Sequence, residues 1–327
     1  KALEHINNAT LLAPLASYRY LRSIALNTTE VHMQYNDANR GIALMIATTF
    51  VFAVQDGISQ YLASEYNVVM IVMVRYWFFA IFVITLSACR PGGIRAAART
   101  TQPVLQILRG LLLVAEICVM VLAFTLLGLI ESHAIFTLYP LLIAALSGPV
   151  LTEKVGWRGW TAIAVGFIGV LIILRPGLRV FSIDALVPLL AALMFALYGL
   201  LTRRAARDDS AATSFFWTGV AGAAAITCIG PFFWASLHGT DWIWMGILCV
   251  TGVGGHWLLI KTYEAAEAGT VQPFAYFQLV FATVIGLTIF RETLDPWTAA
   301  GAGLIVGAGV YSLLWEQQRK RKVSPAL

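Results

Sequence analysis

Ten apolar stretches of roughly bilayer-spanning length fill residues 41 to 317. Each has about 18 to 25 residues, and a helix rising about 1.5 Å per residue crosses a hydrocarbon core of about 30 Å with that length. With 59% hydrophobic and only 12% charged residues, the chain has too few polar residues to cover ten such stretches in a water-soluble domain. We therefore expect an all-α polytopic membrane protein with ten transmembrane helices, at residues 41–62, 68–88, 103–127, 132–152, 157–174, 183–203, 211–231, 242–263, 269–290 and 296–315.

The basic residues collect in every second gap between these stretches. The opposite gaps carry only Arg175, Arg179 and Arg291. By the positive-inside rule, both termini are expected in the cytoplasm. The net charge of +5 then reports topology, whereas a nucleic-acid-binding surface would gather its cations on one face. The basic residues on the expected cytoplasmic side include Arg40, Arg90, Arg95, Arg99, Lys154, Arg158, Arg203, Arg204, Arg207, Lys261 and Arg319 to Lys322.

The two ends of the chain differ from the apolar region. Residues 1–40 are too polar to form a span, and we expect a cytoplasmic N-terminal tail that lies along the membrane surface or is not native to the protein. Residues 318–327 are expected to form a basic cytoplasmic tail. Function is therefore sought in the region between them.

The apolar region divides into two halves of five stretches, residues 41–177 and 178–317. Glu153 in the first half and Glu292 in the second are each followed by a tryptophan and a helix rich in small residues. Because five is an odd number, the second half must enter the membrane from the opposite side. Inverted repeats of this kind enclose a central cavity near the membrane midplane in alternating-access transporters.

Short motifs connect both halves with a known family. The first half contains Glu131-Ser-His-Ala134, Tyr139-Pro140, Leu151-Thr-Glu153 and Gly166-Phe-Ile-Gly169-Val170. The second contains Pro273-Phe-Ala-Tyr276-Phe-Gln278, Phe290-Arg-Glu292 and Asp295-Pro-Trp-Thr298. Together they resemble the two EamA repeats of the drug/metabolite transporter superfamily. The sequence Phe52-Ala53-x-x-Asp56-Gly57 is similar to a pattern of one bacterial branch, in which a lysine often stands near the position of Gln60.

This resemblance implies a ten-helix transporter, a monomer or a weak homo-oligomer, in the bacterial inner membrane. Members of the superfamily carry amino acids, S-adenosylmethionine, riboflavin, nucleotide sugars, sugar phosphates or organic cations. Our leading hypothesis is export of aromatic or other apolar amino acids, as in the YddG-type exporters. The alternative is proton-coupled transport of organic cations or of nucleotide-like metabolites such as S-adenosylmethionine.

Ionisable residues inside the stretches are the first candidates for the site, because a charge in hydrocarbon costs about 2.5 to 3.5 kcal/mol unless it has a partner or a cavity. Asp56 and Arg75 lie at similar depth on neighbouring stretches, so we expect an ion pair that is either structural or part of the cavity. Glu116 lies near the midplane among apolar neighbours and is our candidate for binding a proton or an amine, while Arg109 is two turns away on the same stretch. His256 is its approximate mirror in the second half, either a core histidine or a cavity residue.

Uncharged polar and aromatic residues within the stretches complete the candidates for the cavity. An aromatic cavity with few charges would suit a zwitterion with an apolar side chain, through stacking and cation–π contacts. These candidates are Trp77, Tyr139, Tyr198, Trp217, Tyr276 and Gln278.

The main competing class is an intramembrane transferase. Such an enzyme would need a His/Asp/Glu constellation, a metal-ligand spacing or a nucleophile motif at one membrane interface. Apart from His32 and Asp37 in the N-terminal tail, the sequence offers no such set. We therefore expect a transporter without enzyme activity, cofactor or metal, whose partners are a small molecule, the lipid bilayer and, as an open question, a proton, but not nucleic acid.

Overall fold

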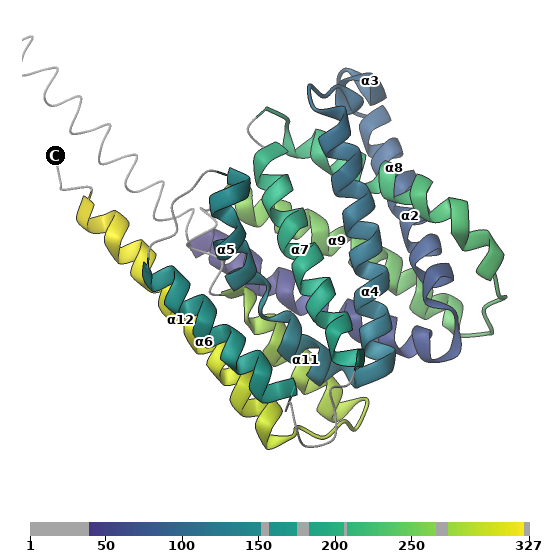
Figure 1. The fold of residues 1–327 in the computed structure, drawn as a ribbon. Coiled ribbons are helices and arrows are strands. Elements are labelled where there is room, and N and C mark those ends of the chain that lie inside the picture. Colours follow the sequence, from purple (N-terminus) through teal and green to yellow (C-terminus); the bar gives the residue numbers. More distant parts are fainter. Residues whose placement is uncertain (1–38, 152–156, 175–182, 206–207, 266–273, 324–327) are drawn as a thin grey trace, which may run out of the picture.

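The computed structural model describes residues 39–151, 157–174, 183–205, 208–265 and 274–323. Within these ranges every regular element is a helix, which confirms the all-α prediction (Figure 1). The first helix is Asn39–Glu65. The others are α2 (Val68–Ala88), α3 (Gly93–Ala98), α4 (Pro103–Phe136), α5 (Tyr139–Leu151), α6 (Trp157–Leu174), η1 (Ile183–Ala185), α7 (Leu186–Ala205), α8 (Ala211–Ile229), η2 (Gly230–Phe233), α9 (Asp241–Ala265), α11 (Phe277–Thr288) and α12 (Pro296–Val323).

Six helices of the described residues are both long and apolar enough to cross a bilayer, which shows a multi-pass membrane protein. They are Asn39–Glu65, Val68–Ala88, Pro103–Phe136, Ile183–Ala205, Ala211–Phe233 and Asp241–Thr262. The predicted count of ten spans is not settled by these six. The N-terminal tail and Glu153 lie outside the described residues.

One glycine divides the long helix α4 into two segments. Gly128 has φ 79° and ψ 177°, a backbone conformation that is not helical and that side chains disfavour. The break falls between the third and fourth predicted stretches, so α4 contains the end of one and the start of the next. The segment after Gly128 continues through a turn at Thr137 into α5.

Several helices start at residues that favour a helix N-terminus, namely capping residues and a proline. The side chain of Asn67 accepts a hydrogen bond from the backbone N–H of Val69 (2.9 Å) and so caps α2. Ser210 caps α8 in the same way through the N–H of Thr213 (3.1 Å). Pro103 begins α4, at the position where its missing N–H has no intrahelical partner.

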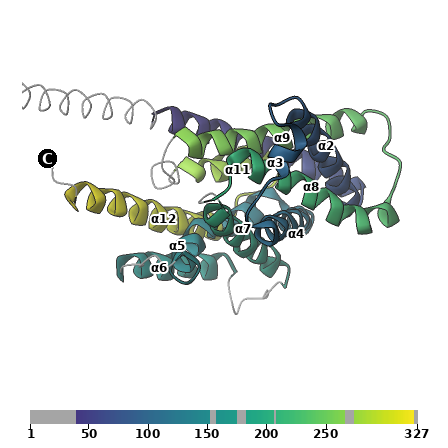
Figure 2. The same ribbon diagram turned by 90° about the horizontal axis from the view of Figure 1, so that it is seen from above.

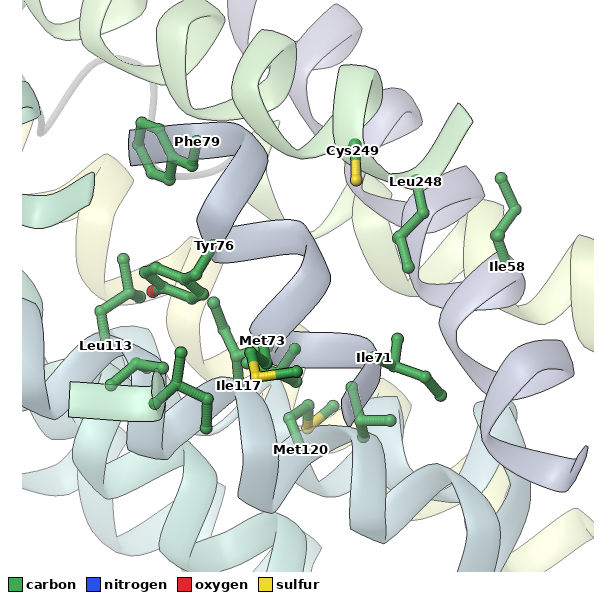
Figure 3. Close-up of a cluster of buried hydrophobic side chains, with 14 of the residues drawn as sticks. Ile58, Ile71, Met73, Tyr76, Phe79, Leu113, Ile117, Met120, Leu248 and Cys249 are labelled. Carbon is green, nitrogen blue, oxygen red and sulfur yellow. The ribbon is translucent and has the colours of Figure 1, made fainter. Parts of the chain in front are cut away.

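Helices of the two halves pack directly against one another. Helix α4 lies along α7 and α8, α2 lies along α8, and α12 lies along α6 (Figures 1 and 2). The α4–α8 approach is close, since a Cβ atom added to Gly110 would lie 2.7 Å from Cβ of Ala221. The main buried cluster fills the space between the first helix, α2, α4 and α9, around Met73, Tyr76 and Leu113 (Figure 3). Both halves therefore share one core.

Large apolar side chains also cover much of the outer surface. Ile81, Phe167, Val250 and Val280 are each at least half exposed. Such a surface would be unstable in water but is matched to lipid hydrocarbon.

Candidate functional site

A cavity lies between the first helix, α2, α4, α7, α9 and α11. Its empty space, part of which is open to solvent, measures about 520 Å³. Helices from both halves contribute to it, as expected for a central cavity between two repeats. Its polar lining consists of Gln55, Asp56, Arg75, Glu116, His256 and Gln278, and its aromatic walls are Phe52, Phe124, Phe136 and Phe195.

Two side chains of opposite charge line this cavity without a hydrogen bond or close ion pair among the described residues. Arg75 on α2 is 5% exposed and Glu116 on α4 is 4% exposed, and neither forms a hydrogen bond or an ion pair there. Burying a charge without a partner is strongly unfavourable, so such groups are stabilised by each other, by neutralisation or by a polar ligand in the cavity.

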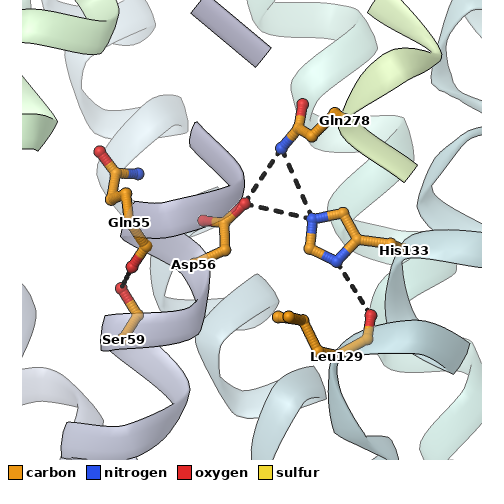
Figure 4. A network of polar contacts seen from close by, with 6 residues as sticks. All are labelled: Gln55, Asp56, Ser59, Leu129, His133 and Gln278. Carbon is orange, nitrogen blue, oxygen red and sulfur yellow. Dashed lines mark hydrogen bonds and ion pairs between the residues drawn. The ribbon is translucent and has the colours of Figure 1, made fainter. Parts of the chain in front are cut away.

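The ion pair that we expected between Asp56 and Arg75 is not formed. Asp56 instead pairs with His133, whose Nε2 lies 3.2 Å from Asp56 Oδ2 (Figure 4). Gln278 on α11 donates to the same oxygen across 3.0 Å. Equal depth on neighbouring stretches therefore did not predict a contact between these two side chains.

His133 was missed as a candidate, although it stands in a motif quoted above. Its ring is fixed on both sides: Nδ1 lies 2.9 Å from the carbonyl oxygen of Leu129, and the ring stacks on Phe124 with centroids 5.2 Å apart. The signal that could have found it is an ionisable residue within an apolar stretch. The fourth stretch was predicted to start at residue 132, and His133 was named there only as part of a family motif.

Two predicted residues lie behind or beside the cavity. The ring of Tyr139 packs on Phe136 and Phe195, so it supports the wall from outside the lining. Tyr276 is buried, and its hydroxyl has no hydrogen-bond partner among the described residues. It packs against Gly309 of α12, not into the cavity.

The remaining aromatic candidates contact other parts of the molecule. Trp77 is 37% exposed, donates to the hydroxyl of Thr227 (2.8 Å) and stacks on Trp234. Trp217 donates to the backbone carbonyl of Ala98 across 3.2 Å. Of the ten predicted site residues, the cavity therefore gathers the acidic, basic, histidine and glutamine members.

Tyr198 and Arg109 belong to a polar network near the end of the molecule that carries α3. The guanidinium of Arg109 lies over the ring of Tyr198 at 5.4 Å and donates to Thr202 (3.0 Å) and to Gln106. Gln106 in turn donates to Asp209 across 2.7 Å. These contacts join α4 to α7 and to the start of α8, so Arg109 is satisfied within the protein.

Asp209 is the centre of this network. Burial alone would raise the pKa of its carboxyl, but hydrogen bonds from Thr100 (2.5 Å) and Gln106 outweigh burial and hold that pKa below its ordinary value. The ionised carboxylate thus ties the loop before α4 to the loop before α8.

A second cavity, of about 630 Å³, lies between the end of α2, α3, α8 and α9. A row of aromatic rings in contact with one another runs from it to the first cavity. His256 contacts Phe52 (centroids 5.4 Å apart) and Phe79 (6.0 Å), Phe79 contacts Phe215 (4.9 Å), and Phe215 contacts Trp257 (5.8 Å). Phe52 and His256 line the first cavity, and Phe215 and Trp257 line the second, so the row connects the walls of the two cavities.

Comparison with known proteins agrees with this architecture. The model of the EamA-like transporter family matches residues 39–175 and 182–314, so the chain belongs to that family and contains two of its repeats. A crystal structure of a protein 18% identical in sequence matches with a TM-score of 0.59, covering 84% of this chain and 97% of that one, which shows a shared fold.

Curated relatives are bacterial transporters. The chain is 23% identical over 281 residues to the S-adenosylmethionine uptake transporter of Rickettsia prowazekii (strain Madrid E), covering 85% of this chain and 94% of the relative. It is 27% identical over 293 residues to the riboflavin transporter of Vibrio cholerae serotype O1, covering 86% and 96%. The protein is therefore a membrane transporter of small metabolites and not an enzyme.

Proposed function

We propose that this transporter carries a metabolite with an α-amino-acid group, and that S-adenosylmethionine is its substrate. The observation that carries the proposal is the pair of buried, unpartnered charges, Arg75 and Glu116, in one cavity. An α-amino acid presents a carboxylate and an ammonium group on one carbon atom. It supplies the two charges that the cavity lacks.

Each charge has a natural partner on the substrate. The guanidinium of Arg75 suits the carboxylate, because its planar fork can donate two parallel hydrogen bonds. Glu116 suits the ammonium group. Because both side chains are largely buried in the protein already, a ligand that pairs with them adds charge-assisted contacts at a reduced desolvation cost.

The rest of the cavity favours S-adenosylmethionine over a simple amino acid. Four phenylalanine rings surround the polar groups and offer stacking faces for a purine base. Asp56 adds a second acidic side chain, which suits a substrate that carries a sulfonium cation besides its amino-acid group. The name of the Rickettsia prowazekii relative agrees with this choice. Export of apolar amino acids, our hypothesis from the sequence, would use the same Arg75 and Glu116 but leaves the second acid unused.

The membrane arrangement belongs to the same proposal. We place the protein in a bacterial inner membrane with both termini in the cytoplasm, on the strength of the charge pattern. Reporter fusions at the C-terminus that are active only in the cytoplasm or only in the periplasm test this orientation.

The deciding experiment is transport by the purified protein in proteoliposomes. Vesicles loaded with unlabelled substrate are offered labelled S-adenosylmethionine, phenylalanine or riboflavin, and the exchange is followed with time. We expect rapid exchange of S-adenosylmethionine, slower exchange of phenylalanine and no exchange of riboflavin, which has no amino-acid group. Exchange of riboflavin alone would refute the proposal and favour the function named for the Vibrio cholerae relative.

A further inference from the structure

The hydrogen bonds around His133 determine which ring nitrogen carries a proton. Nδ1 faces the carbonyl oxygen of Leu129 at 2.9 Å, and a carbonyl only accepts, so Nδ1 is the donor. A neutral imidazole has a single N–H, which leaves Nε2 as an acceptor. Nε2 faces Oδ2 of Asp56 at 3.2 Å. If Asp56 were ionised and His133 neutral, two acceptors would face each other at hydrogen-bond distance.

One additional proton removes this conflict. It either makes Asp56 a neutral acid that donates to His133, or makes His133 an imidazolium that donates to the carboxylate. Both arrangements hold the same number of protons, so the pair as a unit binds one proton. The separation of 3.2 Å between the two atoms in Figure 4 accommodates the shared proton.

Gln278 allows the proton to leave. Its amide nitrogen carries two hydrogens and lies 3.0 Å from Oδ2 of Asp56 and 3.5 Å from Nε2 of His133. Without the shared proton, this single NH₂ group can turn one hydrogen toward each exposed acceptor. The pair can therefore lose its proton without leaving a buried acceptor unsatisfied.

The proton exchanges through the cavity. The side chain of Asp56 is 15% exposed and lines the cavity, whereas that of His133 is 1% exposed. The other ionisable groups that face the same space are Arg75 and Glu116 across the cavity and His256 on α9. Glu292 lies at the other end of the helical turn that carries His133, where its carboxylate accepts hydrogen bonds from the backbone N–H groups of Leu129 and Ile130.

We infer that Asp56 and His133 form a proton-binding site that releases its proton when a cationic substrate enters the cavity. A positive charge placed beside Asp56 interacts favourably with the carboxylate and unfavourably with an added proton, and both effects are strong in a cavity of low dielectric constant. The inference rests on the proposed function, because it requires a cationic substrate such as S-adenosylmethionine. It assigns proton coupling to this pair instead of Glu116.

Substrate-induced proton release tests the inference directly. Purified protein in weakly buffered detergent solution is mixed with S-adenosylmethionine, and the pH change is recorded together with binding by calorimetry. We expect the wild type to release up to about one proton per bound substrate. His133→Gln and Asp56→Asn are expected to bind with no measurable release. His238→Gln, a matched change at an exposed histidine, is expected to behave like the wild type. Binding by the wild type without release, or equal release from His133→Gln, overturns the inference.

A second readout needs no substrate. The chain has five histidines, so nitrogen NMR of histidine-labelled protein gives few signals, and the pair lost in His133→Gln identifies His133. We expect a protonated Nδ1 at every pH and an Nε2 signal that shifts strongly in Asp56→Asn. An Nε2 signal that is unchanged by Asp56→Asn excludes the shared proton. If neither the wild type nor any variant binds S-adenosylmethionine but the Nε2 signal still shifts in Asp56→Asn, the proposed substrate is refuted and the proton-binding site is supported.

Discussion

The carboxylate of Glu292 caps the helical segment that begins at Leu129, whose backbone N–H donates to Oε1 across 2.7 Å. The next backbone N–H, of Ile130, donates to Oε2 across 2.9 Å, and the amide of Gln60 donates to Oε1 across 3.0 Å. A helix start leaves its first N–H groups unpaired and carries a partial positive charge, so an ionised carboxylate is well matched to it. A residue of the second repeat thus stabilises a helix break in the first.

Replacing Glu292 by alanine is expected to destabilise the protein. Loss of a helix cap typically costs about 0.5 to 2 kcal/mol, and here two N–H groups lose their partner together. Thermal unfolding in detergent, followed by intrinsic fluorescence, measures the change. Glu65→Ala, at an exposed position at the end of the first helix, serves as the control and is expected to melt like the wild type. Equal melting temperatures for both variants would show that the cap contributes nothing.

Gly128→Ala is expected to destabilise the same break by another route. The backbone at Gly128 has φ 79°, and an added Cβ atom would lie 2.7 Å from Oε1 of Glu292. Strain of this kind exceeds the roughly 0.4 to 1 kcal/mol that a Gly→Ala change gains where the backbone is compatible. Gly246→Ala is the matched control, since that glycine lies within α9 and no atom would approach the new Cβ within 4 Å. A lower melting temperature is expected for the first variant only.

Arg75→Gln and Glu116→Gln are expected to weaken substrate binding. A hydrogen bond to a charged group contributes about 1.5 to 3 kcal/mol, which corresponds to a loss of roughly 10-fold to more than 100-fold in affinity. Arg95→Gln, at an exposed position on α3, is expected to leave affinity unchanged. Calorimetry with a substrate analogue that lacks the carboxylate sharpens the test. If Arg75 binds that carboxylate, Arg75→Gln has no further effect on the analogue, and an equal loss for both ligands would contradict the assignment.

Asp209→Asn is expected to reduce stability in a manner that depends on pH. Because hydrogen bonds lower the pKa of Asp209 in the folded protein, its stabilising effect is fully present above pH 3.8, the ordinary value for this carboxyl, and is lost as the pH falls through the lowered pKa. The variant should therefore melt below the wild type at pH 6, and the difference should shrink toward pH 3. Asp184→Asn, an exposed carboxylate, is the control. A difference that stays constant over this range would disprove the ionic contribution of Asp209.

Phe215→Ala is expected to open a path between the two cavities. Its ring lies between Phe79 and Trp257, so removing it thins the row of rings between the two spaces. We expect faster loss of labelled substrate from loaded proteoliposomes without external substrate, with exchange retained. Phe82→Ala, which removes a ring that is 37% exposed, should not change the leak. An unchanged leak in Phe215→Ala would show that the row of rings is not a barrier.

The helical class was predicted from the length of the apolar stretches. The charged members of the site were predicted for a second physical reason. A charge within an apolar stretch is so unfavourable that it must face a cavity or a partner, and Asp56, Arg75 and Glu116 all line the cavity. The same reasoning does not extend to aromatic residues, which are stable in lipid, in the core and in a cavity alike. The sequence therefore offered no physical reason to place Trp77 and Tyr198 in the cavity and not in the lipid or the protein core.

The pairing of Asp56 could not be predicted from depth alone. Successive residues of a helix are rotated by about 100°, so two residues at equal depth face each other only if both helices have the right rotation, which packing decides. The partner that the structure shows, His133, depends on the break at Gly128. The positive φ there is tolerated by glycine, but a glycine in an apolar region is equally compatible with close helix packing.

Asp56 and Gln60 lie four residues apart, on one face of the first helix. Asp56 contacts His133, and Gln60 donates a hydrogen bond to Glu292. Glu292 in turn accepts a hydrogen bond from the backbone N–H of Leu129. Leu129 and His133 are the two ends of a single helical turn. Rotation of the first helix about its own axis would separate both contacts in one step, so we expect them to form and break together. The proton shared by Asp56 and His133 at one end of this turn is thereby linked to the hydrogen bonds that Glu292, from the other repeat, makes at the opposite end.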